Sequence, residues 1–350
     1  MTVSKVGVGL DIGSSGVRLA AIRRSRRGPV LVAYGHAALR PEENPLEYVD
    51  PDALTESVKR LLKQESVPQG SVCIGLSDQR IVARQVEIPW IPADEFATAL
   101  PLLTTDLMPM PVEDSVLDFL PSEEFVDDKG GRNLRGLLVA ANASFVESIV
   151  EAVEAGGLRV DRVDFGPLGA LRAACDPAPA TVEAVLDLGH SGTSLVVHEG
   201  SRPTFVRVMS QGGQAVTEGL AKELGMTSEQ AEAWKLAVGR LWGRMSAADQ
   251  QRTHRALDAS VLPLIDEIRS SLTFQRTNTG IRVSKILLTG GGAAQFGLDF
   301  QLRQTLQVEV ERATPVQRLA AVSIKNYPEG MAGSETETAS AIGLALAVAA

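Results

Sequence analysis

Apolar residues occur in short runs that alternate with glycine-containing polar turns in both halves of the chain. Two polar turns, beginning at Asp11 and Asp187, each lie between two such runs. A glycine-rich turn with an apolar run on either side is typical of a β-hairpin. We therefore predict one hairpin at the start of each half.

Longer segments with apolar residues on one face separate the short runs and predict helices. They cover 52–64, 144–155, 228–238 and about 260–276. Further strands are expected over 30–37, 71–76, 116–120, 134–141 and 285–288. Between 79 and 155 the order is strand, helix, two strands and helix, which we interpret as a small inserted α+β subdomain. The mixture indicates an α/β fold.

The two hairpin turns share one sequence motif. Residues 11–19 and 187–195 both fit D-(I/L)-G-x-S-G-x-x-L and lie about half the chain apart. A repeat on this scale indicates two related lobes that arose by duplication. A third glycine-rich turn, 290–292, follows the strand expected over 285–288.

These turns suit a polyphosphate ligand. Glycine lets backbone N–H groups approach phosphate oxygens closely. Asp11 and Asp187 would repel bare phosphate, but they suit a hydrated Mg²⁺ that bridges phosphates. Arg18 can return positive charge to the first turn. The candidates for binding in the turns are Asp11, Gly13, Ser14, Ser15, Arg18, Asp187, Gly189, Ser191, Gly192, Thr193, Gly290, Gly291 and Gly292. The alternative interpretation of each turn is an ordinary hairpin.

Composition narrows the class of protein. The chain has 350 residues, of which 44% are hydrophobic and 22% charged, as in globular proteins of about two domains. Its formal net charge of -9 argues against nucleic acid as a partner. Two cysteines cannot form a disulfide framework, and no long uncharged apolar run predicts a membrane span. Neither a Walker A motif nor a Rossmann motif occurs.

With these motifs the chain resembles the actin, Hsp70 chaperone and sugar-kinase superfamily. Residues 11–18 and 187–193 resemble its two phosphate motifs, 287–293 its adenosine motif and 339–345 its C-terminal connecting helix. Within the superfamily, the Pro-punctuated segment 107–119 and the helices around 221–235 resemble the type IV pilus assembly protein PilM family, which is related to cell-division protein FtsA.

The resemblance implies an actin-like, RNase-H-like duplicated fold with ATP and Mg²⁺ between two lobes. It also implies that Glu232 and Lys235 contact ribose and adenine; the alternative is a surface ion pair. The expected division is first-lobe core 1–78, inserted subdomain 79–155, connecting segment 156–182, second-lobe core 183–210, helical insertion 211–280, second-lobe core 281–338 and a connecting helix 339–350 that returns to the first lobe.

For function, the resemblance implies a cytoplasmic scaffold of pilus assembly, recruited to the inner face of the membrane by its partners. The partners are the cytoplasmic N-terminal segment of a PilN-type inner-membrane protein, held through the inserted subdomain, and other pilus assembly proteins. Nucleotide would close the lobes and modulate partner binding. Whether the protein forms a homo-oligomer is left open by the resemblance. The alternatives are a small-molecule kinase, an FtsA-like filament-forming ATPase and an interaction module without nucleotide.

Three features stand outside this expectation. Gly166 precedes Pro167 where Hsp70 chaperones carry a glutamate that positions water, and Asp164 is displaced by two positions, so we expect slow or negligible hydrolysis. His190 could bind phosphate or face solvent. The arginines of 23–27 could touch anionic lipid or form a solvated hairpin tip.

Overall fold

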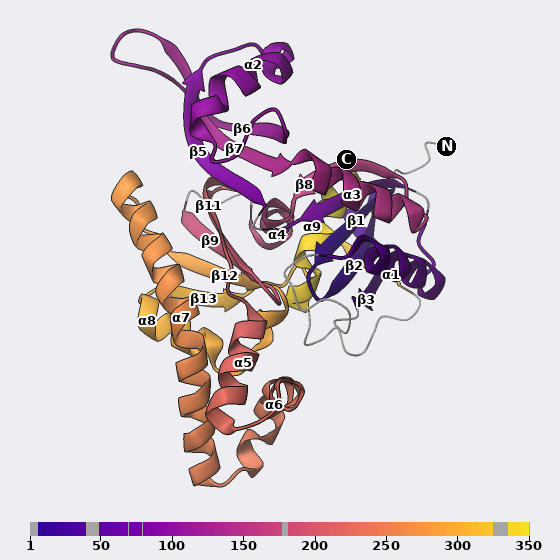
Figure 1. Ribbon diagram of the computed structural model, residues 1–350, viewed down its shortest axis with the longest axis vertical. Coiled ribbons are helices and arrows are strands. Elements are labelled where there is room, and N and C mark those ends of the chain that lie inside the picture. Colours follow the sequence, from indigo (N-terminus) through magenta and orange to yellow (C-terminus); the bar gives the residue numbers. More distant parts are fainter. Residues whose placement is uncertain are drawn as a thin grey trace.

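Two lobes face each other in the structure, and a small third sheet extends from one end (Figure 1). The computed structural model describes residues 6–39, 49–68, 70–78, 80–176, 181–324 and 335–349. Within these ranges no helix has both the length and the apolar character that crossing a bilayer requires. Each lobe is built on a mixed β-sheet with helices on its faces, as expected for an actin-like α/β fold.

The first lobe contains a six-stranded sheet in the order β14-β3-β2-β1-β4-β8. Its strands are β1 (Val6–Gly13), β2 (Gly16–Ser25), β3 (Gly28–Ala38), β4 (Ser71–Leu76), β8 (Val160–Phe165) and β14 (Ala321–Val322). The predicted hairpin is β1–β2, in which Gly13 pairs with Gly16. Helix α1 (Pro51–Gln64) connects β3 to β4 and begins where the Asp50 carboxylate accepts a hydrogen bond from the Ala53 amide.

The second lobe repeats this topology. Its sheet has the order β11-β10-β9-β12-β13, with β9 (Val182–Leu188), β10 (Thr193–Glu199), β11 (Arg202–Met209), β12 (Lys285–Thr289) and β13 (Glu309–Arg312). In both lobes the first three strands are antiparallel neighbours, and the fourth runs parallel to the first. The predicted duplication is therefore confirmed at the level of strand order, apart from β14, which adds an edge to the first sheet.

The second lobe contains α5 (Gly213–Leu224), α6 (Ser228–Leu241), η4 (Trp242–Arg244), α7 (Ala247–Thr279) and α8 (Leu298–Leu306). Helices α5, α6 and the first part of α7 extend away from its sheet toward the bottom of Figure 1, whereas α8 lies beside β13. The Thr227–Gln230 capping box that starts α6 is present. Helix α7 begins thirteen residues before the predicted 260, with Ser246 as its N-cap. Its first turn is largely exposed, so it lacks the apolar stripe on which the prediction relied.

The inserted segment forms its own three-stranded sheet in the order β5-β7-β6. Its elements are β5 (Ile81–Pro89), η2 (Ala93–Glu95), α2 (Phe96–Thr104), η3 (Thr105–Leu107), β6 (Ser115–Val126) and β7 (Arg132–Asn142). Ile88, Phe119 and Leu138 lie in a separate small core. Helix α3 (Ala143–Ala155), which the sequence pattern grouped with this block, packs differently. Its buried residues, such as Ile149, join the core of the first lobe, because they face α1.

Two helices between the sheets connect the lobes, α4 (Gly166–Ala174) and α9 (Ala339–Val348) (Figure 1). They cross through glycines: a Cβ added at Gly343 would lie 1.8 Å from the Gly169 carbonyl oxygen. Helix α9 also presses on β1, where a Cβ at Gly9 would lie 2.1 Å from the Ala341 carbonyl oxygen. The lobes are thus joined by backbone contacts that larger side chains would prevent.

Candidate functional site

A cleft of about 1150 Å³ opens between the lobes. It is larger than most small-molecule sites, which measure roughly 300–1000 Å³. Every residue that the sequence singled out for binding lines it: Asp11, Gly13, Ser14, Ser15, Arg18, Asp187, Gly189, Ser191, Gly192, Thr193, Glu232, Lys235, Gly290, Gly291 and Gly292. Residues far apart in the sequence therefore share one cavity, and none of the predicted set lies elsewhere.

The two hairpin turns touch each other across this cleft. The Ser191 hydroxyl lies 2.7 Å from the Ser14 hydroxyl, and the Ser191 amide donates to the same Ser14 oxygen at 3.3 Å. Within the second turn, the Gly189 amide donates to the Gly192 carbonyl at 2.9 Å. Because both turns present small residues, their backbone N–H groups can come close to a bound anion.

Asp11 and Asp187 lie on matching strands, β1 and β9, and both face the cleft. Burial raises the pKa of Asp11 to about 6, with a smaller contribution from the charge of Asp187, while Arg18 works in the opposite direction. Burial also raises the pKa of Asp187, although Thr289 donates a hydrogen bond to it at 2.8 Å. A pair of carboxylates that resists carrying both charges is suited to a cation.

The donor set fits Mg²⁺ in particular. No group of three or more His, Cys, Asp or Glu side chains with metal-site geometry occurs in the ranges that the structure describes. Mg²⁺ does not need such a cage, because it usually binds one or two carboxylates and completes its shell with water and phosphate oxygens. Asp11 and Asp187 supply that number.

Arg18 faces Asp11 across the first hairpin and lies beside both carboxylates. Its Nη2 donates to the Glu337 carboxylate at 3.2 Å, whereas its buried Nε has no hydrogen-bond partner. Glu337 belongs to η7 (Glu335–Thr338), immediately before α9, and lines the cleft. Sequence reasoning missed Glu337, because nothing in its local pattern marks it. Arg18 therefore lines the cleft with a buried donor that has no partner among the residues that the structure describes.

The third glycine turn continues into η5 (Gly291–Ala294) and packs against the second. Gly290 has φ +81° and a Cβ there would lie 2.4 Å from the Leu188 carbonyl oxygen, so only glycine fits. A Cβ at Gly292 would lie 2.8 Å from that of Leu188. The backbone of the turn is therefore exposed to the cleft without side chains in front of it.

Glu232 and Lys235 lie on one face of α6, with Nζ and Oε2 2.7 Å apart. Lys235 also donates to the Gly213 carbonyl at 2.9 Å and to the Thr217 hydroxyl at 2.7 Å, and its side chain is only 10% exposed. Burial works to raise the pKa of Glu232, but hydrogen bonds from Lys235 and Thr217 hold it below its usual value. The pair thus connects α6 to the start of α5. A solvated surface ion pair, the alternative interpretation, would not make these additional contacts.

Several lining residues could not have been found from motifs. Leu236 is 70% exposed and lines the cleft, as does Phe296, whose ring packs on Trp242 with centroids 4.8 Å apart. Ser77 also lines the cleft. His190 also lines the cleft, and its exposed side chain leaves both of its interpretations open.

The structure has no water-positioning carboxylate at position 166. A Cβ added at Gly166 would lie 2.1 Å from the Ser77 hydroxyl oxygen, so Ser77 occupies the space of that side chain. Asp164 is not among the lining residues, and it forms an ion pair with Arg172 at 2.6 Å. Neither position 166 nor Asp164 therefore supplies a carboxylate to the cleft.

Comparisons with known proteins agree with this architecture. The chain is similar to a solved PilM-PilN type IV pilus biogenesis complex, with 28% identity, a TM-score of 0.82 and full coverage of both chains. MreB5 of Spiroplasma citri bound to ADP shares the fold, with a TM-score of 0.52 at 10% identity over 97% of this chain and 94% of its own. Cell division protein FtsA of Bacillus subtilis is 22% identical over 90% of this chain and 80% of its own length.

The family of this chain is identified by a family model. It describes the type IV pilus assembly protein PilM and matches residues 9–349, a span that contains both hairpin turns, the inserted sheet and both connecting helices. Since the match runs through every part of the fold described above, this chain belongs to the PilM family of type IV pilus assembly proteins.

Proposed function

We propose that the protein is an ATP-binding scaffold of the type IV pilus machinery. In this role it holds the N-terminal segment of a PilN-type protein at the inner face of the cytoplasmic membrane. The observation that carries the proposal is the convergence of three glycine turns and two carboxylates on one cleft. The similarity to a PilM-PilN complex supports the choice of partner.

Each part of the cleft has a role in this proposal. The N–H groups of the turns at Gly13, Gly189 and Gly290 bind the phosphates, and Arg18 adds positive charge. Asp11 and Asp187 hold Mg²⁺ through water; when bound, this ion neutralises part of the phosphate charge.

The far end of the cleft would receive the nucleoside. Glu232 and Lys235 contact the ribose and the base, and Leu236 and Phe296 offer apolar surface beside the base. Lys235 keeps its position because three acceptors already hold its ammonium group. A binding site prepared in this way loses little conformational entropy when nucleotide binds.

The protein acts as a scaffold in this proposal because neither position 166 nor Asp164 offers a carboxylate that could orient a water molecule in the cleft. Ser77 fills the space beside Gly166, and Asp164 is paired with Arg172. Bound ATP would therefore persist, and its presence or absence would set the angle between the lobes. A partner with different affinities for the two arrangements would then respond to nucleotide.

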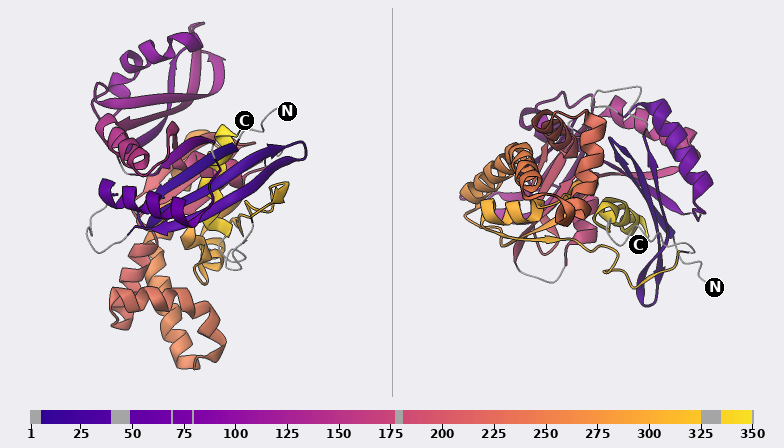
Figure 2. Two further views of the ribbon diagram at one scale, coloured as in Figure 1. Left: turned by 90° about the vertical axis from the view of Figure 1, so that its right-hand side faces the viewer. Right: turned by 90° about the horizontal axis from the view of Figure 1, so that it is seen from below.

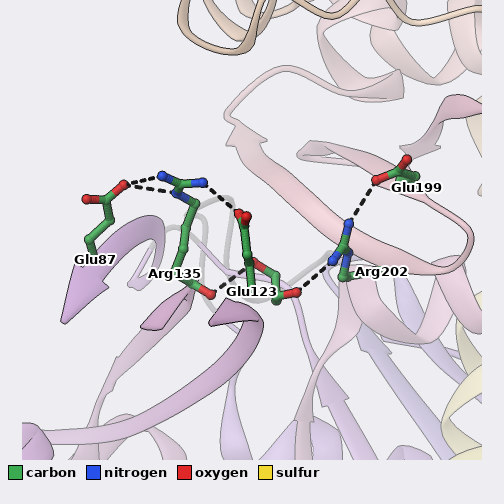
Figure 3. A network of polar contacts seen from close by, with 6 residues as sticks. Glu87, Glu123, Arg135, Glu199 and Arg202 are labelled. Carbon is green, nitrogen blue, oxygen red and sulfur yellow. Dashed lines mark hydrogen bonds and ion pairs between the residues drawn. The ribbon is translucent and has the colours of Figure 1, made fainter. Parts of the chain in front are cut away.

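A direct contact offers a route from the cleft to the inserted subdomain. Arg202 on β11 of the second lobe donates to the Ser122 carbonyl of β6 at 2.7 Å and forms an ion pair with Glu199 (Figure 3). On the other side, Arg135 connects Glu87 and Glu123 within the inserted sheet. The inserted subdomain follows the first lobe in sequence but touches the second, so movement between the lobes would reach it.

Calorimetry tests the nucleotide site. Asp11→Asn should weaken binding of Mg²⁺–ATP about tenfold or more, because it removes a charged ligand of the hydrated ion. Asp266→Asn is the matched control and should bind as the wild type does, because Asp266 lies on α7, pairs with Arg269 and is not among the residues that line the cleft. Equal affinities for all three proteins would refute the assigned role of Asp11.

A peptide with the sequence of the N-terminal segment of a PilN-type protein tests the scaffold. We expect it to bind the full chain, with a different affinity in the presence of Mg²⁺–ATP. Absence of peptide binding under both conditions would refute the scaffold. Equal affinity with and without nucleotide would refute the coupling alone.

A further inference from the structure

A strongly basic tip ends the β2–β3 hairpin. Arg23, Arg24, Arg26 and Arg27 are all exposed, and none of their guanidinium groups forms an ion pair or hydrogen bond with another residue that the structure describes. The tip projects beyond the body of the first lobe (Figure 2). The nucleotide cleft and the inserted sheet use none of these arginines.

The backbone of the tip is held by its own hydrogen bonds. The Ser25 hydroxyl donates to the Gly28 carbonyl at 2.8 Å and accepts from the Arg27 amide at 3.2 Å. Gly28 has φ +120°, a conformation that favours glycine. The arginines are therefore presented on an ordered turn rather than on a loose loop.

The two segments that form the tip and its neighbouring strand contain no acidic residue that could neutralise it. No Asp or Glu occurs in the sequence between Asp11 and Glu42, so the whole hairpin is free of acids. The segment 313–324, which runs beside β3 through β14, also contains none. Such separation of positive charge is unusual in a chain whose net charge is -9, and it indicates a negatively charged binding partner.

We infer that this tip binds the anionic phospholipid surface of the membrane. The inference rests on the proposed function in one respect only, which is that the proposed partner brings the protein near a membrane. Guanidinium groups match phosphate geometry and hold it with paired hydrogen bonds. The tip carries no large apolar side chain, which a protein interface would need at its centre. The net charge of -9 of the whole chain disfavours duplex nucleic acid as the partner.

Binding of this kind is electrostatic and weak, and it works together with a second contact. Each basic residue near an anionic bilayer strengthens binding about fivefold, and the effect falls off within a Debye length of about 8 Å at physiological salt. When the proposed partner segment already holds the protein at the membrane, even weak contacts of the tip become intramolecular and persist.

Vesicle sedimentation tests the inference on the full chain. We expect the wild type to bind vesicles of phosphatidylcholine mixed with phosphatidylglycerol, and to be released as salt is raised. The double variant Arg26→Ser/Arg27→Ser should bind roughly 25-fold more weakly, at about fivefold per residue. Because both side chains are exposed and unpaired, the variant should melt at the wild-type temperature.

The matched control is Arg255→Ser/Arg276→Ser on α7, across the molecule from β2 and β3 (Figure 1). It makes the same change in net charge with exposed side chains, and it should bind vesicles as the wild type does. Equal binding by the tip variant and the wild type would overturn the inference. So would equal binding to pure phosphatidylcholine, or no binding by the wild type, which would point to an acidic protein segment instead.

The outcome is independent of the proposed nucleotide site. Mg²⁺–ATP affinity and peptide affinity of the tip variant should equal those of the wild type, because the tip lies outside the cleft. Failure of nucleotide binding with intact vesicle binding would therefore refute the proposed function and leave this inference standing.

Discussion

Replacing Gly343 with alanine tests how closely the two connecting helices must pack. The new Cβ would lie 1.8 Å from the carbonyl oxygen of Gly169, whereas ordinary contacts begin at 3.4 Å. The neighbour is backbone and not the end of a flexible side chain, so it cannot turn away. Helices α4 and α9 would have to move apart by about 1.6 Å, although α9 is also pressed against β1 at Gly7 and Gly9.

The expected cost follows from this geometry. Overpacking by one methyl group costs about 1–3 kcal/mol, and the upper value applies where backbone has to move. An unfolding entropy of about 2.1 cal/mol/K per residue amounts to about 0.7 kcal/mol/K for 350 residues. Gly343→Ala should therefore lower the melting temperature by about 4 °C if the lobes unfold together. It should also weaken Mg²⁺–ATP binding, because separated connecting helices widen the cleft.

Differential scanning calorimetry of the full chain measures this effect. Gly243→Ala is the matched control: it makes the same chemical change where nothing lies within 4 Å of the new Cβ. We expect its melting temperature to stay within about 1 °C of the wild type. If Gly343→Ala also melted at the wild-type temperature, the close crossing of α4 and α9 would be wrong.

Three further predictions concern other parts of the molecule. His198 is fully buried, and burial lowers its pKa from 6.5 to about 4. As the pH falls, the unfolded state therefore takes up a proton on His198 before the folded state does. The free energy of unfolding should be highest above pH 6.5 and fall by up to about 3 kcal/mol as the pH drops to 4. His198→Phe should flatten that part of the melting profile, and an unchanged profile would contradict the assignment. Arg202→Ala should reduce the effect of nucleotide on peptide affinity, whereas Arg207→Ala on the same strand should not, and equal behaviour of the two variants would exclude the contact as the route. Gly166→Glu should weaken ATP binding and not accelerate hydrolysis, because its Cβ would displace the Ser77 side chain, which lines the cleft; faster phosphate release in a turnover assay would refute this.

The hairpins could be predicted because their signals are local. A glycine turn between apolar runs needs only neighbouring residues to form, and both copies of the motif adopt the same register, with Asp11 opposite Arg18 and Asp187 opposite Ser194. The capping box at the start of α6 is local in the same sense, because its partners lie three residues apart.

Other features could not be predicted because they depend on packing. Helix α3 was grouped with the inserted subdomain on the basis of sequence order, yet its apolar face meets α1 in the first lobe. Glu337 reaches Arg18 from the other end of the chain, and Ser77, which directly follows β4, fills the space beside Gly166 at the start of α4. The periodicity of apolar residues along the chain does not indicate such contacts between residues far apart in the sequence.

The sequence by itself determined which residues can approach a phosphate, since the absence of a side chain at a glycine turn is a property of that position alone. The tertiary structure decided that these turns meet. The hydroxyls of Ser14 and Ser191 lie 2.7 Å apart only because the glycine crossing of α4 and α9 brings the two lobes together, and that distance is set by packing across the whole molecule.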